Sequence, residues 1–265
     1  MTPSLIIGAR NKNKKHTFHS EGWCVSFACV MKIYQAVICI LAAATSLVLC
    51  SCSSSGGGVA LPVSNVQPAS KSMSELYSEV RVTVDMVPKG QHGRRDVRSM
   101  SPRYITIHST RNFDRGATAL KHAEAMGNGA FTSRKLIGGN RTGYLTWHYT
   151  VDQSLAVQHL PRTEQGEHAD FDGPGNNSSI GIEMCENAGN DLTATLDRTA
   201  KLTAWLMHKH GVPLNNVVPH YHWPRKLITP ARKACPQILL DHGVPGKKWK
   251  RFLALVDRYY KSIAT

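Results

Sequence analysis

The stretch that decides the fold is Ser179-Ile180-Gly181-Ile182-Glu183-Met184-Cys185, in which large apolar residues alternate with other types. A period of two predicts a β-strand whose two isoleucines and methionine face the core. Glu183 and Gly181 then share the opposite face, where glycine leaves space beside the carboxylate. We therefore expect a central strand that presents one carboxylate on an open face.

Other strand patterns precede this segment. Residues 103–108 alternate in the same way, and His108 ends the polar face, so its imidazole is expected to point toward a cleft. Apolar runs at 146–152 and 156–160 are separated by a short turn and predict a hairpin. Valines that alternate with polar residues at 80–84 predict a first short strand or extended arm.

Helical patterns alternate with these strands. The clearest covers 192–210, where apolar residues follow one broad face and Gly211 provides the stop. Residues 117–126 and 249–263 also predict helices, and 216–220 predict a short strand that delivers a histidine. The order strand, helix, hairpin, strand, helix, strand, helix predicts an α/β fold with a central mixed β-sheet flanked by helices.

The stretch from Pro219 to Pro236 carries His220, Cys235 and, two residues before the cysteine, Lys233. Imidazole and thiolate are ligands suited to zinc, and a lysine beside a thiolate ligand is a plausible partner for an oxyanion. Taken alone, the stretch is equally compatible with a surface loop over a buried thiol. Its chemistry depends on a third ligand and a base upstream.

His108 and Glu183 supply these two groups at strand positions. Three protein ligands and a water make up a catalytic zinc site, whereas a structural site is closed by four. Zinc lowers the pKa of its bound water to about 7, and a nearby carboxylate can accept the proton during attack. In the plain structural alternative, His108 caps a strand at the surface and Glu183 is a solvated carboxylate.

Four segments carry a resemblance to a known family. They are Tyr104–His108, Trp147–Asp152, Ser179–Glu183 and Lys233–Pro236. In this order they resemble type 2 N-acetylmuramoyl-L-alanine amidases, the family of phage endolysin amidases and peptidoglycan recognition proteins. The similarity covers about Arg98 to Leu240, and it implies a single zinc amidase domain.

The resemblance also implies roles for individual residues. His108, His220 and Cys235 match the three zinc ligands, and other branches of the family carry Asp in place of this cysteine. Glu183 matches the general base that acts on the zinc-bound water. Lys233 matches the lysine that stabilises charge on the carbonyl oxygen.

The chain also departs from the family pattern. His168 matches a histidine that lines the substrate groove in a His-Ala-Gly motif, but Asp170 replaces the glycine. Trp147, also expected at the groove, stands where many members carry a catalytic tyrosine. The run from Tyr221 to Arg232 is longer than in most relatives. His148 is interpreted as structural rather than as a ligand.

The N-terminal part resembles an export signal. An apolar run at 33–49 follows a basic residue and precedes small residues and Cys52, as in bacterial lipoprotein signals. We expect residues 1–52 to be a leader with Cys52 lipidated, 53–72 a flexible tether and 73–265 the catalytic domain. The alternative is an uncleaved membrane helix.

The net charge of the chain limits the classes of partner that we expect it to bind. The 265 residues carry a formal net charge of +14, and with five of the 32 basic and one of the 18 acidic residues before position 52, the remainder carries +10. A basic surface favours nucleic acid, anionic lipid or an anionic cell-wall polymer. Export disfavours nucleic acid. The resemblance implies peptidoglycan as the partner, and the signal-like N-terminus predicts a lipid-anchored membrane contact. A monomer in the cell envelope, at the outer membrane and facing the periplasm, is the corresponding expectation.

Cysteine usage leaves two alternatives. Of seven cysteines, only Cys185 and Cys235 follow the expected processing site. Exported proteins often pair their cysteines in disulfides, so a bridge between these two competes with a ligand role for Cys235.

The functional expectation is a zinc enzyme that hydrolyses the amide between N-acetylmuramic acid and L-alanine in peptidoglycan. A peptidoglycan-binding module without catalysis and a zinc endopeptidase of the stem peptide are the alternatives.

Overall fold

The computed structural model of the chain describes residues 67–133, 142–226 and 228–264. The expected leader, the expected lipidation site Cys52 and residues 53–66 of the expected tether lie outside this part. Among the described residues, none of the helices combines the length and the apolar character that crossing a membrane requires.

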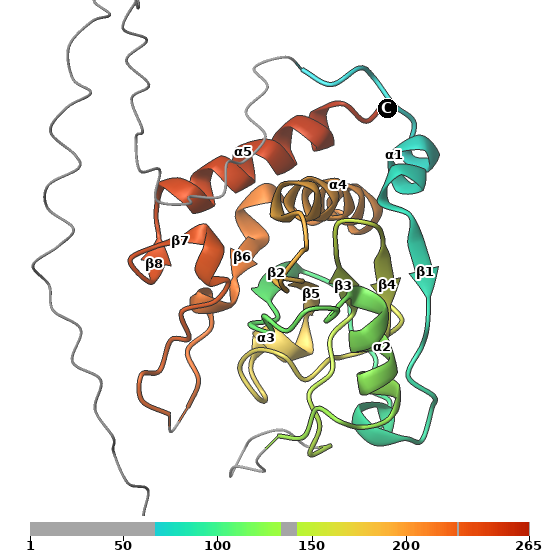
Figure 1. Ribbon diagram of the computed structural model, residues 1–265, viewed down its shortest axis with the longest axis vertical. Helices are drawn as coiled ribbons and strands as arrows, with labels where there is room; N and C mark the ends of the chain where they lie inside the picture. Colours follow the sequence, from blue (N-terminus) through green and yellow to red (C-terminus); the bar gives the residue numbers. More distant parts are fainter. Residues whose placement is uncertain (1–66, 134–141, 227, 265) are drawn as a thin grey trace, which may run out of the picture. The chain divides into compact units, whose positions relative to one another are not determined.

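A six-stranded sheet forms the centre of the fold (Figure 1), in the order β1-β4-β3-β5-β2-β6. Only the β3–β4 pair is antiparallel, so the sheet is mixed as predicted. The strands are β1 (Val82–Val84), β2 (Tyr104–Ser109), β3 (Tyr149–Val151), β4 (Ala156–Gln158), β5 (Ser179–Met184) and β6 (Val217–Pro219). The predicted hairpin is confirmed as β3 and β4.

Helices cover both faces of this sheet. They are α1 (Met73–Val80), α2 (Ala119–Gly127), α3 (Pro174–Asn177), α4 (Leu192–His210) and α5 (Lys247–Lys261). Helix α4 packs on β3 and β5 and is covered by α1 and α5, whereas α2 packs on β3 and β4. Within β4, Ala156 joins the core under α4 and the next residue, Val157, joins the cluster under α2. Because successive strand residues point to opposite faces, α2 and α4 lie on opposite sides.

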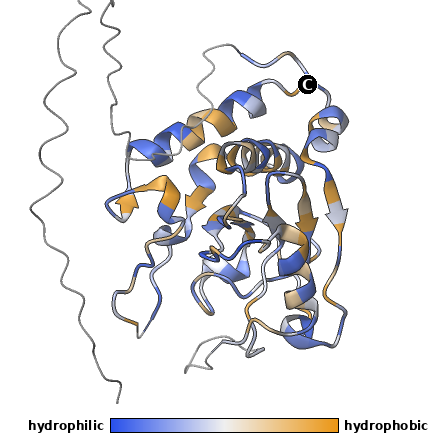
Figure 2. Cartoon of the chain, in the orientation of Figure 1, coloured by the Kyte–Doolittle hydropathy of each residue, from blue (hydrophilic) through white to orange (hydrophobic). Residues whose placement is uncertain are grey.

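Helix α4 has the bounds expected from the sequence. Asp191 caps its start by accepting hydrogen bonds from the amides of Thr193 and Ala194, at 2.8 and 3.1 Å. Gly211 ends it at φ 66°, a left-handed conformation that favours glycine. The apolar face of α4 and the isoleucines of β5 belong to the same buried cluster. Figure 2 shows apolar residues along the strands and on part of α5.

Helix α1 was not predicted, although its start carries a local signal. The Ser72 hydroxyl accepts from the Glu75 amide at 3.2 Å, and the Glu75 carboxylate accepts from the Ser72 amide at 2.7 Å. This reciprocal capping box begins the helix. Just before it, Lys71 exchanges backbone hydrogen bonds of 2.8 Å with Ser262 and Ala264 after α5. The segment that enters α1 is therefore held against the end of α5.

The remaining elements are short. They are the 3-10 turns His92–Arg94, Leu214–Asn216, His220–His222 and Gln237–Leu239, and the small hairpin of β7 (Leu240–Asp241) and β8 (Val244–Pro245). The turn at 220–222 follows β6 directly, at the carboxyl edge of the sheet.

Candidate metal centre

The first two candidate residues lie side by side on the central strands. Strands β2 and β5 run parallel, with His108 as the direct partner of Glu183 in the register. His108 Nδ1 lies 3.8 Å from Glu183 Oε1, and both side chains are largely buried. Because parallel strands end at the same edge of a sheet, the two groups meet where α/β folds bind ligands.

The third strand at this edge brings His220 to the same place. Strand β6 pairs with the other side of β2 and ends at Pro219, so His220 follows it as the first residue of a 3-10 turn. His220 Nδ1 lies 2.9 Å from His108 Nδ1. The two imidazoles that are predicted as ligands thus approach each other through their Nδ1 atoms.

Cys235 returns to this point from the far end of the loop. Its carbonyl accepts from the Tyr221 amide at 3.0 Å, which ties the two ends of the loop together. The ligand atoms of His108, His220 and Cys235 all lie within 4.8 Å of one another. Cys185 and Cys235 are free, buried thiols, so the disulfide alternative is not formed.

A chain of hydrogen bonds sets the tautomer of His108. The Ser179 carbonyl can only accept, so His168 Nε2 donates to it across 3.3 Å. Burial lowers the pKa of His168 to about 3, which keeps this ring neutral. Its Nδ1 therefore accepts from His108 Nε2 at 3.0 Å. His108 in turn presents the lone pair of Nδ1 toward His220, the orientation a metal ligand needs.

Gly181 makes room for this arrangement. A Cβ at Gly181 would lie 2.9 Å from three atoms of the His168 ring, so the space expected beside Glu183 is filled by that imidazole. The Gly181 amide donates to His148 Nδ1 at 3.0 Å, and His148 Nε2 pairs with the Glu164 carbonyl at 2.8 Å. Both nitrogens of His148 are used in backbone hydrogen bonds, as its structural interpretation predicted.

Burial governs the charges at this edge. It raises the pKa of Glu183 to about 8, against the opposing charge of Lys233, and the pKa of the Cys235 thiol to about 12. It also lowers the pKa of His108 and of His220 well below the ordinary value. The centre therefore offers two neutral imidazoles and one thiol.

This donor set fits zinc. Nitrogen and sulfur ligands in groups of three are those of a catalytic zinc site, and binding of the metal displaces the thiol proton. Glu183 Oε2 is buried and has no hydrogen-bond partner among the described residues. A buried carboxylate oxygen without a partner is costly, and a water held at the metal centre would satisfy it.

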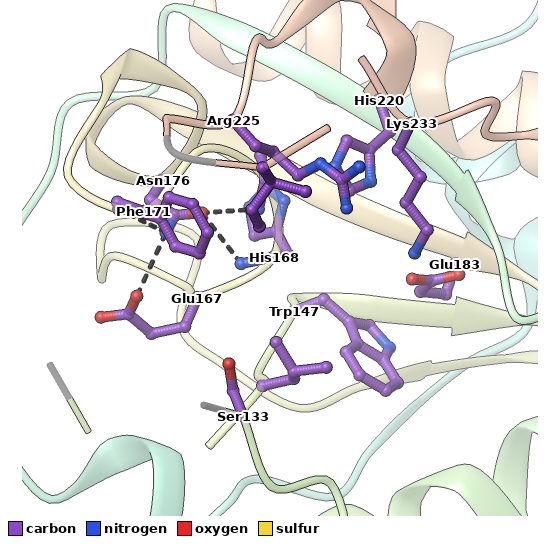
Figure 3. A pocket seen from close by; sticks show the side chains of 13 residues that line it. Ser133, Trp147, Glu167, His168, Phe171, Asn176, Glu183, His220, Arg225 and Lys233 are labelled. Atoms are coloured by element: carbon purple, nitrogen blue, oxygen red, sulfur yellow. Dashed lines mark hydrogen bonds between the residues drawn. The ribbon is translucent and has the colours of Figure 1, made fainter. Parts of the chain in front are cut away.

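A pocket of about 220 Å³ opens over the centre (Figure 3). Lys233 extends toward Glu183 in this pocket, with His220 beside it. Trp147 and His168 also line it, but Trp147 Nε1 already donates to Thr150 Oγ1 at 2.7 Å. The full lining is Ser133, Leu145, Trp147, Glu167, His168, Ala169, Phe171, Asn176, Glu183, His220, Arg225, Ile228 and Lys233.

The unusual Asp170 has a structural explanation. Its carboxylate accepts from the amides of Gly175 and Asn176, both at 2.9 Å, in the turn that forms α3. The Asn176 side chain in turn accepts from the amides of His168 at 2.9 Å and Ala169 at 2.7 Å. The replacement of glycine therefore fixes the segment that carries His168.

Asn176 and Arg225 are among the pocket residues that were not predicted from the sequence. Asn176 had a signal in the run of small and amide residues after Asp170, which favours side-chain to backbone hydrogen bonds. Arg225 lines the pocket from inside the loop 221–232. Nothing in its local sequence distinguishes it from the other basic residues of that loop.

Sequence comparisons agree with this geometry. The profile of the N-acetylmuramoyl-L-alanine amidase family matches residues 98–238. The chain is 39% identical over 176 residues to the N-acetylmuramoyl-L-alanine amidase CwlH of Bacillus subtilis, covering 66% of this chain and 60% of CwlH. It is 39% identical over 163 residues to XlyA of the same organism, covering 61% of this chain and 48% of XlyA. The chain thus spans about half to three fifths of these relatives.

Structural comparisons give the same result. A mutant endolysin from Bacillus subtilis and the catalytic domain of XlyA share 38% identity with the chain, with TM-scores of 0.55 and 0.54. In both cases 67% of this chain and 99% of the other are covered. The chain therefore resembles these two structures over almost their full length.

Proposed function

The chain belongs to the N-acetylmuramoyl-L-alanine amidase family, and from this premise we propose that it is a zinc-dependent hydrolase of peptidoglycan. The bond cleaved is the amide between the lactyl group of N-acetylmuramic acid and L-alanine. The observation that carries the proposal is the meeting of His108, His220 and Cys235 within 4.8 Å, beside the carboxylate of Glu183.

The residues divide the chemistry among them. His108, His220 and Cys235 hold the zinc, which supplies Lewis acidity and a water of lowered pKa. Glu183 accepts the proton of the attacking water and delivers it to the nitrogen of the departing L-alanine. The Lys233 ammonium stabilises the negative charge that develops on the carbonyl oxygen. His168 and Trp147 form walls of the pocket in which the muramyl peptide lies.

Digestion of purified peptidoglycan tests this function. Wild-type protein should release stem peptides that begin with L-alanine, as identified by mass spectrometry, and a chelator should stop the release until zinc is added back. Metal analysis should find one zinc per chain. Fragments cut within the stem peptide would indicate an endopeptidase instead, and binding without any release would indicate a binding module.

We also propose that the protein acts as a monomer, lipid-anchored through Cys52 at the outer membrane and facing the periplasm. The support is the sequence alone, namely the apolar run at 33–49 with small residues and a cysteine after it. Mass spectrometry of the detergent-extracted protein should find an acylated N-terminal Cys52. Any other N-terminus contradicts the anchor.

A further inference from the structure

The loop 221–232 is anchored to the central sheet. Trp223 is 4% exposed, and its Nε1 donates to Thr106 Oγ1 of β2 at 2.9 Å. Its ring also packs edge-on against Tyr104 of the same strand, at 5.1 Å between centroids. The start of the loop is therefore fixed relative to the metal centre.

The loop then folds back on itself as a narrow hairpin. Pro224 bridges to Arg232, and the Arg225 amide donates to the Ala231 carbonyl at 2.8 Å. The Arg232 guanidinium donates to the Tyr221 carbonyl at 3.0 Å and lies over the Tyr221 ring at 5.7 Å. These contacts hold the backbone of Arg225 at the rim of the pocket.

The Arg225 side chain enters the pocket without an acidic partner among the described residues. Its guanidinium donates from Nη2 to the Pro230 carbonyl at 3.0 Å, and its buried Nε has no hydrogen-bond partner there. A partly buried guanidinium with unused N–H groups is a strong site for an anion, because a carboxylate can accept two parallel hydrogen bonds from it.

The other charges of the pocket are already assigned. Glu167 pairs with Arg98 and accepts from Asn176, and Glu183 lies beside Lys233 in Figure 3. Lys233 belongs to the oxyanion of the scissile carbonyl. Arg225 is then a second cation in the same pocket. Its guanidinium is available to bind a fixed anion of the substrate.

Peptidoglycan chemistry identifies that anion, an inference that rests on the proposed function. The lactyl carboxyl of N-acetylmuramic acid is consumed in the scissile amide, so the glycan side offers no carboxylate, whereas the stem peptide carries free ones. We propose that Arg225 forms a carboxylate subsite for the stem peptide and so makes the enzyme selective for free over amidated peptides.

Two matched substrates test the subsite. One is a soluble muramyl peptide with free peptide carboxylates, and the other is the same compound with carboxamides in their place. Wild-type protein should cleave the free form with a kcat/KM about 10 to 100 times higher, the range expected for a charge-assisted pair. In Arg225→Gln the advantage should disappear through a higher KM, with kcat changed only a few-fold.

Two further variants separate the subsite from the fold of the loop. Arg225→Lys keeps the charge but not the fork, and should retain part of the selectivity. Lys226→Gln removes the neighbouring cation of the same loop, which is exposed and does not line the pocket, and should keep the wild-type ratio. An Arg225→Gln protein with the wild-type ratio, or a wild-type enzyme that cleaves both substrates equally, overturns the subsite. Cleavage of neither substrate by wild type instead contradicts the amidase function.

Discussion

The two halves of the metal centre are built in different ways. The sheet half, His108 and Glu183, lies on paired strands in which the register itself places the two residues opposite each other. The loop half, His220, Lys233 and Cys235, lies on a 3-10 turn and the end of a hairpin loop. One half is held by a continuous backbone ladder, and the other by a few hydrogen bonds and one buried tryptophan.

This difference separates the part of the site that is fixed by the sheet from the part that can vary with the loop. The ladder places the backbones of His108 and Glu183 opposite each other, and the side chain of His168 then orients the His108 ring. The loop half closes the ligand set and also carries Arg225 into the pocket. A change in this loop can therefore alter the lining of the pocket while the ladder keeps His108 and Glu183 in place.

The largest expected effect is in the sheet half, from Glu183→Ala. Loss of the carboxylate that moves the proton should lower kcat by about 10² to 10⁴-fold. Zinc content should stay at one per chain, because Glu183 is not a ligand. Stem-peptide release and metal analysis measure the two quantities on the same preparation. Full activity in this variant would refute the role of Glu183.

The next largest effect is expected on zinc affinity, from a change at His168. Replacing His168 with Ala removes the acceptor that holds the Nε2 proton of His108, so zinc affinity should fall about 10 to 100-fold. Competition with a chromophoric chelator measures this affinity without any turnover. His168→Gln offers a carbonyl oxygen in place of Nδ1 and should recover part of the loss. Unchanged affinity in His168→Ala would mean that the ladder alone orients His108.

Acid should lower the free energy of unfolding through protonation of His148. Burial lowers the pKa of His148 to about 4, below its ordinary value of 6.5, so the unfolded chain binds the additional proton. The stability that the fold gains while His148 is neutral is fully present above about pH 6.5 and is lost as pH falls toward about 4. In His148→Gln the slope of unfolding free energy against pH in this window should fall by about 1.4 kcal/mol per pH unit. Urea unfolding at several pH values measures the slope, and an unchanged slope contradicts the assignment.

The smallest effect compares two tryptophans that make the same type of bond. Trp223 donates to Thr106 at the base of the loop, and Trp147 donates to Thr150 of β3. Replacing either with Phe removes one N–H donor and should cost about 1 kcal/mol in unfolding free energy. Only Trp223→Phe should also weaken zinc binding, because of the two tryptophans only Trp223 anchors the loop half. Equal zinc affinity in the two variants would show that the loop does not depend on this anchor.

Local patterns predicted much of the fold. The alternation at 179–185 and 103–108 gave β5 and β2 with the correct faces, and Gly211 marked the end of α4. Helix α1 begins with a capping box, but the composition of residues 53–72 predicts a tether and the valines at 80–84 predict a strand, so these patterns do not indicate the helix between them. The strands were predicted from the alternation of side chains along one segment, and the end of α4 from the glycine that follows it, and both are local properties of the sequence.

The sequence by itself determined most of the strands and helices and which residues are suited to bind zinc or move a proton. Only the tertiary structure decided that the rings of His108 and His220, 112 positions apart, meet through Nδ1, and that His168 orients the first of them. It also decided that Cys235 stays a free thiol and that Arg225 enters the pocket. The reason is physical: periodicity is set by neighbouring residues, whereas these meetings depend on strand order and on packing between distant segments.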